Sequence, residues 1–165
     1  MLALGIDPGT AICGFGLVEI LGNRLKAVHY GAILTSPRTV PAERLKIIFD
    51  ELDTLIKTYK PDVMGVEELF FNKNVKTVMA VGQARGVVLL AAAHNNIRIE
   101  EYTPLQVKQS VVGYGKATKE QVMYMTQRLL NLVDKPKPDD VADALAIAVC
   151  TAHSVKSNNV WSSIR

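Results

Sequence analysis

The first 34 residues contain three strand-like segments joined by connections that are too short to hold a helix. One apolar run extends from Leu2 to Ile6 and stops at Asp-Pro-Gly, and a second extends from Cys13 to Ile20. Gly22 and Asn23 form a tight-turn signal, after which a third run extends from Arg24 to Leu34. Because strands with such short connections pair antiparallel, the sequence predicts a three-stranded meander.

The rest of the chain alternates helical and extended patterns. Apolar residues at helical spacing predict a helix that begins near Pro41, where a missing N–H costs nothing, and stops before Pro61. Thr118 and Gln121 form a capping box at the start of a later helix. The other predicted elements are strands over 63–66 and 97–102, helices over 75–94 and 104–113, and a last helix that starts near 139.

Together these elements predict an α/β fold, a five-stranded mixed sheet flanked by helices on both faces. Of the 165 residues, 48% are hydrophobic and 21% are charged, which suits one domain with a substantial core and excludes a disordered chain. We assign that domain to residues 1–154 and interpret the polar residues 155–165 as a flexible C-terminal tail.

Charge and cysteine usage bear on partners and location. The net charge is only +3, so a nucleic-acid footprint must come from local clustering of basic residues. Cys13 and Cys150 match no metal-ligand spacing and are expected to be reduced thiols. The sequence shows no signal-peptide pattern, and its longest apolar run, Gly86–Ala93, is too short to cross a bilayer. We therefore expect a cytoplasmic protein without membrane contact.

Four carboxylates stand where apolar segments stop or start. Asp7 ends the first strand, Glu67 ends the fourth, and Asp140 and Asp143 share one face of the last helix at i, i+3 spacing. If the first and fourth strands are parallel neighbours, their carboxyl ends bring Asp7 and Glu67 together. Crowded carboxylates repel one another, and Mg²⁺ prefers oxygen ligands, so the pattern indicates a metal site. Two such ions can promote hydrolysis of a phosphodiester.

Each carboxylate also has a structural interpretation. Asp7 precedes Pro-Gly and can be a turn former, or part of a phosphate-binding loop as in actin-like ATPases, although the sequence holds no second copy of that loop. Glu67 can pair with a lysine, and Asp139 and Asp140 can cap a helix N-terminus. A purely structural role fits Asp143 less well, because apolar residues follow it and a buried carboxylate needs a partner.

Five segments, in this order, resemble the bacterial RuvC family of Holliday-junction-resolving endonucleases: GIDPGT, GVEELFFNKN, GQARGVVLLAAA, QVKQSVVGYGKATKEQV and DDVADALAIA. The resemblance covers about Leu2 to His153 and implies the RNase H-like fold. It also implies four acidic residues that are both catalytic and Mg²⁺ ligands. By motif these are Asp7, Glu67, Asp140 and Asp143.

The same resemblance decides between two adjacent pairs of acids. The family's glutamate directly follows the apolar strand, which selects Glu67 rather than Glu68. The family's aspartates are three residues apart, which selects Asp140 rather than Asp139 as the partner of the last one. On a strand Glu68 would face away from Glu67.

The resemblance further implies the activity. Family members cut two opposed strands of a four-way junction as homodimers and cooperate with the RuvA and RuvB branch-migration proteins. The implied cofactor is Mg²⁺, for which Mn²⁺ can substitute, and we expect two ions per site, with one ion as the alternative. The implied products carry 5′-phosphate and 3′-hydroxyl ends. The alternative within the same fold is a nuclease that acts on another structured nucleic acid, such as an RNA/DNA hybrid.

Aromatic and basic residues near these motifs are candidate DNA contacts. Phe70 stands where the family places an aromatic residue beside an unpaired base, and Phe71 can assist it or pack inward. Lys108 and Lys119 match family lysines implicated in phosphate contact, whereas spacing alone would leave them as solvated lysines. Weaker candidates for phosphate contact are Lys73, Lys76, Lys116, Arg128, Lys135 and Lys137.

The helix predicted over 75–94 has an unusually smooth surface of small apolar residues. Such a surface fits a buried core helix and a dimer interface equally well, because small residues allow close helix approach. Arg85 interrupts it, and we expect its guanidinium to contact DNA backbone or the dimer partner.

Overall fold

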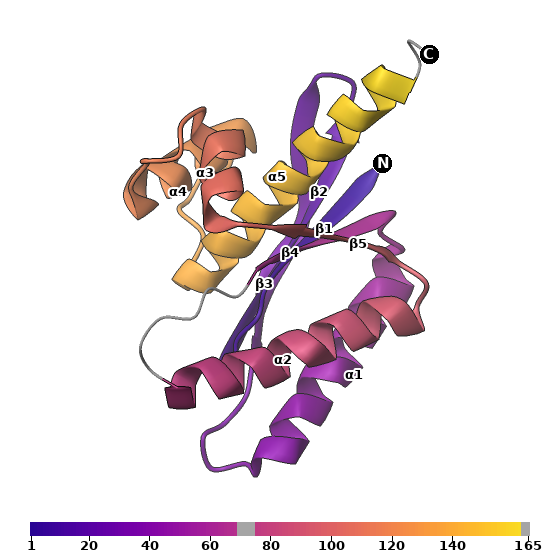
Figure 1. The fold of residues 1–165 in the computed structure, drawn as a ribbon, viewed down its shortest axis with the longest axis vertical. Coiled ribbons are helices and arrows are strands. Elements are labelled where there is room, and N and C mark those ends of the chain that lie inside the picture. Colours follow the sequence, from indigo (N-terminus) through magenta and orange to yellow (C-terminus); the bar gives the residue numbers. More distant parts are fainter. Residues whose placement is uncertain (69–74, 163–165) are drawn as a thin grey trace.

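The computed structural model describes the backbone of residues 1–68 and 75–162, and the side chains of 1–68 and 78–155. Figure 1 shows the elements in chain order. They are β1 (Leu2–Asp7), β2 (Ile12–Leu21), β3 (Arg24–Leu34), α1 (Pro41–Tyr59), β4 (Val63–Glu67), α2 (Val75–His94), β5 (Arg98–Tyr102), α3 (Pro104–Val112), α4 (Lys119–Leu129) and α5 (Asp139–Ser162).

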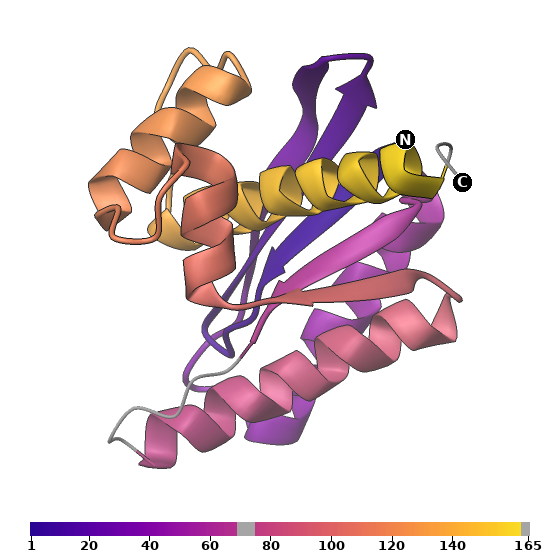
Figure 2. The same ribbon diagram turned by 45° about the horizontal axis from the view of Figure 1, so that its top comes forward.

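The five strands form one mixed sheet in the order β3-β2-β1-β4-β5. The pairs β1–β2 and β2–β3 are antiparallel, whereas β1–β4 and β4–β5 are parallel. The predicted meander is therefore confirmed, and so is the placement of the first strand beside the fourth. Figure 2 shows the strands of the parallel half between the long helices.

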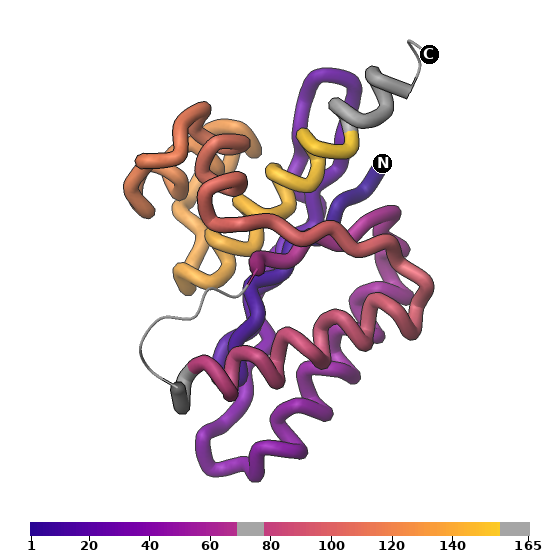
Figure 3. The backbone as a smooth tube through the Cα atoms, viewed as in Figure 1, coloured from indigo at the N-terminus to yellow at the C-terminus, as the bar shows by residue number. Residues whose placement is uncertain are grey.

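Helices cover both faces of this sheet, as the sequence predicts. Because side chains alternate along a strand, Leu4 and Ile6 of β1 point to one face, where they pack with Ile48 and Leu52 of α1 and with the buried residues of α2. The other face packs against α5, and α3 and α4 pack on α5. Figure 3 shows how the backbone returns across the sheet in α5 after α3 and α4.

Glycines let α5 approach the sheet very closely. A Cβ atom added to Gly5 would overlap the carbonyl oxygen of Ala144, and one added to Gly14 would overlap that of Asp140. Any side chain at these two positions would therefore push α5 away from β1 and β2. This close approach places the first turns of α5 directly over the carboxyl end of β1.

The end of α5 differs from the predicted domain boundary. Its helical backbone continues to Ser162, so the boundary proposed between 154 and 155 does not coincide with the end of the helix. The polar residues there include no glycine or proline, and a helix that has already formed extends at little cost. In the described part of the chain, no helix is long and apolar enough to span a membrane.

Candidate active site

The sheet topology brings Asp7 and Glu67 together. Ile6 of β1 is in register with Val66 of β4, so the residues that follow lie side by side at the carboxyl ends of two parallel strands. Both side chains lie on the face that α5 covers, since they alternate with Ile6 and Val66, which pack in the core on the α1 side. The ladder continues beyond them, where the N–H of Glu68 donates to the carbonyl of Tyr102 at 2.8 Å.

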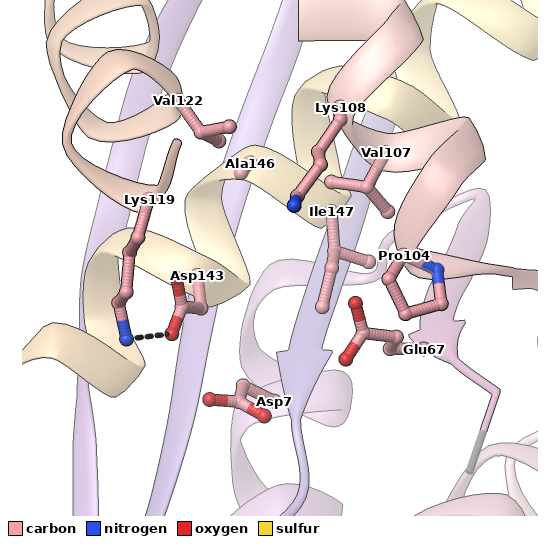
Figure 4. Close-up of a pocket in the computed structure, with 10 residues that line it drawn as sticks. All are labelled: Asp7, Glu67, Pro104, Val107, Lys108, Lys119, Val122, Asp143, Ala146 and Ile147. Atoms are coloured by element: carbon pink, nitrogen blue, oxygen red, sulfur yellow. Dashed lines mark hydrogen bonds and ion pairs between the residues drawn. The ribbon is translucent and has the colours of Figure 1, made fainter. Parts of the chain in front are cut away.

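The first turns of α5 add the second pair of carboxylates. Asp143 lines a cavity of about 200 Å³ together with Asp7 and Glu67. Figure 4 shows these three carboxylates around a common space, with Asp7 below Asp143 and Glu67 across from it. Asp140 is half-buried and does not line the cavity, but its charge is close enough to act on Asp7. The structure thus brings three of the four predicted acidic residues, Asp7, Glu67 and Asp143, to one cavity, with the charge of Asp140 nearby.

Burial and mutual repulsion disfavour the ionised form of the carboxyl groups at this site. Burial, followed by the charges of Asp143, Asp140 and Glu67, raises the pKa of Asp7 to about 7. Burial and Asp143 also raise the pKa of Glu67, against the opposing effect of Lys108 and Lys119. A bound cation would favour the ionised forms of Asp7 and Glu67.

Two lysines reach the cavity from helices that the sequence places far from the carboxylates. Lys119, at the start of α4, donates to Asp143 Oδ2 at 2.8 Å and lies 3.7 Å from Asp139 Oδ2. The hydrogen bond to Asp143 raises the pKa of Lys119. Lys108 extends from α3 toward the same space (Figure 4). Both predicted lysines therefore line the cavity, and Lys119 already neutralises part of its charge.

The chemistry of the donor set suits a hard divalent cation, because the carboxylates offer only oxygen. Among the residues that the structure describes, no three acidic, histidine or cysteine side chains converge closely enough to coordinate an ion as they stand. Lys119 donates to Oδ2 of Asp143, so that oxygen shares its charge with an ammonium group. The shared cavity and the raised pKa of Asp7 are the observations that fit a bound cation.

Two features of the site were not foreseen from the sequence. The cavity has an apolar wall formed by Pro104, Val107, Val122, Ala146 and Ile147, which excludes water from one side of the carboxylates. The sequence shows these residues only as the apolar faces of three helices, and their meeting depends on helix packing. Separately, the thiol of Cys13 is buried near the site, where burial raises its pKa to about 12.

The cavity is not lined by the remaining predicted DNA contacts that the structure describes, which are Arg85, Lys116, Arg128, Lys135 and Lys137. Arg85 forms an ion pair with Glu101 of β5, and its side chain is only 19% exposed, so its guanidinium already has a partner within the chain. Lys116 is exposed on the connection between α3 and α4. Phe70, Phe71, Lys73 and the side chain of Lys76 lie outside the described residues.

Comparison with known proteins gives concordant matches. The model of the family described as crossover junction endodeoxyribonuclease RuvC matches residues 3–151. The chain is 60% identical over 155 residues to that enzyme from Heliobacterium modesticaldum, covering 94% of this chain and 96% of the relative. It is 58% identical over 154 residues to the one from Alkaliphilus oremlandii, covering 93% of this chain and 94% of the relative.

Solved structures give the same picture. The RuvC of T. thermophilus in complex with a Holliday junction substrate superimposes with a TM-score of 0.91 at 35% identity, over 96% of each chain. The yeast mitochondrial Holliday junction resolvase Ydc2 matches with a TM-score of 0.62 at 14% identity, over 90% of this chain and 77% of the other, which shows a shared fold.

Proposed function

Because this chain belongs to the RuvC family of crossover junction endodeoxyribonucleases, we propose that it resolves Holliday junctions by cutting two opposed DNA strands. The observation that carries the proposal is the cavity at the carboxyl edge of the sheet, where Asp7, Glu67 and Asp143 meet Lys108 and Lys119. Carboxylates that need a cation, beside lysines that can bind phosphate, form a site suited to phosphodiester hydrolysis.

The cofactor of this site is a pair of Mg²⁺ ions, for which Mn²⁺ can substitute. The side chains that would hold them are Asp7, Glu67, Asp140 and Asp143. When bound, such ions supply an acidified water and stabilise the charge that develops on the leaving oxygen. The raised pKa of Asp7 supports this assignment, because a carboxylate that resists ionisation gains most from a divalent partner.

The lysines act on the phosphate. Lys108 has no carboxylate partner in the described part of the chain, so its ammonium is available to a phosphate oxygen at the cavity. Lys119 neutralises Asp143 and can move to the phosphate once that carboxylate has another cation. We assign 5′-phosphate and 3′-hydroxyl ends to the products.

Paired cuts require two sites, and α2 offers a face on which two subunits can meet. Met79 and Leu90 are 64% and 59% exposed on this helix, and a Cβ added to Gly86 would meet nothing within 4 Å. This smooth apolar strip supports a homodimer in which helices approach closely. Replacement of Leu90 by Arg should then yield a monomer in size-exclusion chromatography.

Further DNA contacts and partners follow from the family. We propose junction contacts for Phe70 and Phe71, cooperation with RuvA and RuvB, and action on chromosomal DNA in the cytoplasm. The lysines at 73, 76 and 116 are proposed as phosphate contacts. For Arg85, the ion pair with Glu101 favours a role within the protein, and a DNA or dimer contact would require that pair to open.

The first experiment is cleavage of an end-labelled four-way DNA junction, with linear duplex and RNA/DNA hybrid as controls, in Mg²⁺ and in EDTA. Symmetric nicks on opposed strands of the junction alone, in Mg²⁺ alone, are the expected result. Cleavage of the hybrid with the junction left intact would keep the site but replace the substrate with another structured nucleic acid.

Adjacent acids supply matched variants for this assay. Asp7→Asn should retain junction binding and lose cleavage. Glu67→Gln and Asp140→Asn should lose cleavage, whereas the neighbouring Glu68→Gln and Asp139→Asn should keep it, since the spacing of the family's acidic residues selects Glu67 and Asp140. Equal loss in both members of a pair would show that the residue assignments are wrong.

A further inference from the structure

Arg44 is tied by hydrogen bonds to the loop that follows Asp7. Its Nε donates to the hydroxyl of Thr35 at 2.7 Å, and that hydroxyl donates to the carbonyl oxygen of Thr10. The backbone N–H of Thr35 donates to the carbonyl of Ala11 at 3.1 Å. Thr35 is only 9% exposed, so the hydrogen bonds that join the loop, the end of β3 and α1 are shielded from water. The guanidinium is thus oriented by a buried hydroxyl group.

This arrangement lies at the same edge of the sheet as the carboxylates. Residues 8–11 lead directly from Asp7 into β2, and Ile12 at the start of β2 pairs with Leu34 at the end of β3. Thr35 follows Leu34, and Arg44 lies in the first turn of α1. Because α1 covers the face opposite α5, Arg44 flanks the carboxyl edge from the side that Lys108 and Lys119 do not reach.

Arg44 has donors that the protein does not use. Arg85 pairs with Glu101 and Arg98 pairs with Glu100. Arg44 is half-buried but forms no ion pair with any described residue, including its sequence neighbour Glu43. Within the same described set, only its Nε has an acceptor, which leaves Nη1 and Nη2 available. A partly buried cation without a counter-ion is suited to an external anion.

We propose that Arg44 binds a backbone phosphate of the DNA strand that crosses the carboxyl edge of the sheet at Asp7. This inference rests on the proposed function and adds a phosphate site on the α1 side of the scissile position. The paired Nη groups of a guanidinium match two phosphate oxygens, and the hydrogen bond to Thr35 fixes the fork before DNA arrives. Arg44 on one face of the sheet, and Lys108 and Lys119 on the other, would then hold the DNA strand with its phosphodiester over Asp7 and Glu67.

The test measures junction binding against salt concentration, in EDTA so that no cleavage occurs. Each duplex phosphate contact contributes about 0.9 to the slope of log affinity against log salt. Arg44→Gln should lower the steepness by about that amount and weaken binding roughly tenfold. The matched control is Arg98→Gln, which also removes one arginine. Arg98 starts β5 at the opposite edge of the sheet, so its loss should leave the slope unchanged.

Two further variants separate phosphate binding from a structural role. Arg44→Lys keeps the charge and should retain the wild-type slope with weaker binding, because lysine lacks the fork. Thr35→Val keeps Arg44 but removes its anchor, and should weaken junction binding more than Thr35→Ser does. These Thr35 variants decide the question if Arg44→Gln does not fold.

The outcomes are distinct. An unchanged slope in a folded Arg44→Gln protein, or an equal loss in Arg98→Gln, would overturn the inference while the wild type still cut junctions. A wild-type protein that neither bound nor cut the junction would overturn the proposed function itself, and with it the ligand assigned to Arg44. Inorganic phosphate is the competitor that checks for a free-anion site: half-displacement of junction at low millimolar phosphate would contradict a site that needs the polyanion.

Discussion

The two faces of the sheet are packed in opposite ways. On the α1 and α2 face, large aliphatic side chains such as Leu4 and Leu52 separate sheet and helices, and both are fully buried. On the α5 face, Gly5 and Gly14 leave so little space that the helix backbone lies against the strands. Both faces are buried, but only one brings a helix within reach of short side chains on the sheet.

This difference explains where the site can be. An aspartate side chain extends only a few bonds from its backbone, so Asp7 on a strand and Asp143 on a helix can share a cavity only where strand and helix nearly touch. The α1 and α2 face stabilises the fold, because folding transfers its large apolar side chains from water to the core. The α5 face, where Gly5 and Gly14 lie, buries less apolar side chain but brings Asp7 and Asp143 close together. The following predictions test this division between the faces.

The largest effect is expected from Gly5→Ala. The new Cβ would overlap the backbone oxygen of Ala144 and lie 2.9 Å from Cα of Ala148, so α5 must shift. We expect a loss of about 3 kcal/mol in the free energy of unfolding from overpacking. Cleavage should fall by roughly 100-fold in the protein that remains folded, because displaced catalytic groups act poorly. Urea denaturation and single-turnover cleavage measure the two effects.

Leu52→Ala on the opposite face should separate stability from activity. Leu52 is fully buried, and its truncation should lower the free energy of unfolding by about 3 kcal/mol through lost burial and a residual cavity. Because α1 does not hold a carboxylate of the site, the cleavage rate per folded molecule should stay near that of the wild type. A rate loss as large as that of Gly5→Ala, at equal stability, would remove the contrast between the faces.

Sequence reasoning could predict the strands, the neighbouring carboxyl ends of β1 and β4, and hence the meeting of Asp7 with Glu67. These follow from local patterns and from the rules for parallel strands. The role of Gly14 could not be predicted, because a glycine in a strand pattern does not show which helix crosses it. The pairing of Lys119 with Asp143, and of Arg85 with Glu101, likewise depends on distances between elements that are separate in sequence.

The negative charge of Asp7, on the α5 face of the sheet, should lower the free energy of unfolding when no metal is present. The pKa of Asp7 is about 7 in the folded protein and 3.8 ordinarily, so the native state binds this proton more tightly than the unfolded state. Stability from this group is therefore greatest below pH 4 and falls as the pH rises to 7. The difference corresponds to about 4 kcal/mol at full effect, and we expect about half of it because the cavity opens to solvent.

Asp7→Asn should accordingly be more stable than the wild type above pH 7 in EDTA, by about 2 kcal/mol, and the advantage should vanish near pH 4. Thermal unfolding across this pH range measures it. Addition of Mg²⁺ at pH 8 should stabilise the wild type and not the variant. Glu68→Gln, which removes an exposed neighbouring carboxylate, is the control. An advantage of Asp7→Asn that is the same at pH 4 and pH 8 would contradict the burial of charge.

The smallest predicted effect concerns Gly65 of β4, where α5 presents a side chain rather than backbone. A Cβ at Gly65 would overlap the hydroxyl of Thr151, and would lie 3.2 Å from its Cβ. Thr151→Ala alone should cost little, because its hydroxyl donates to the carbonyl of Ile147 within its own helix at 2.8 Å. Gly65→Ala should be destabilising alone and less so in the Thr151→Ala background.

A double-mutant cycle in urea should therefore give a favourable coupling of about 1 kcal/mol between Gly65→Ala and Thr151→Ala. The corresponding cycle of Gly5→Ala with Ala148→Gly should show less coupling, because the carbonyl of Ala144 is backbone and cannot be removed by substitution. Both glycines meet α5, so the two cycles distinguish a contact with a helix side chain, at Gly65, from a contact with the helix backbone, at Gly5. We expect this backbone contact to hold α5 where Asp143 lies over Asp7, so equal coupling in both cycles would place the rigidity of the site elsewhere.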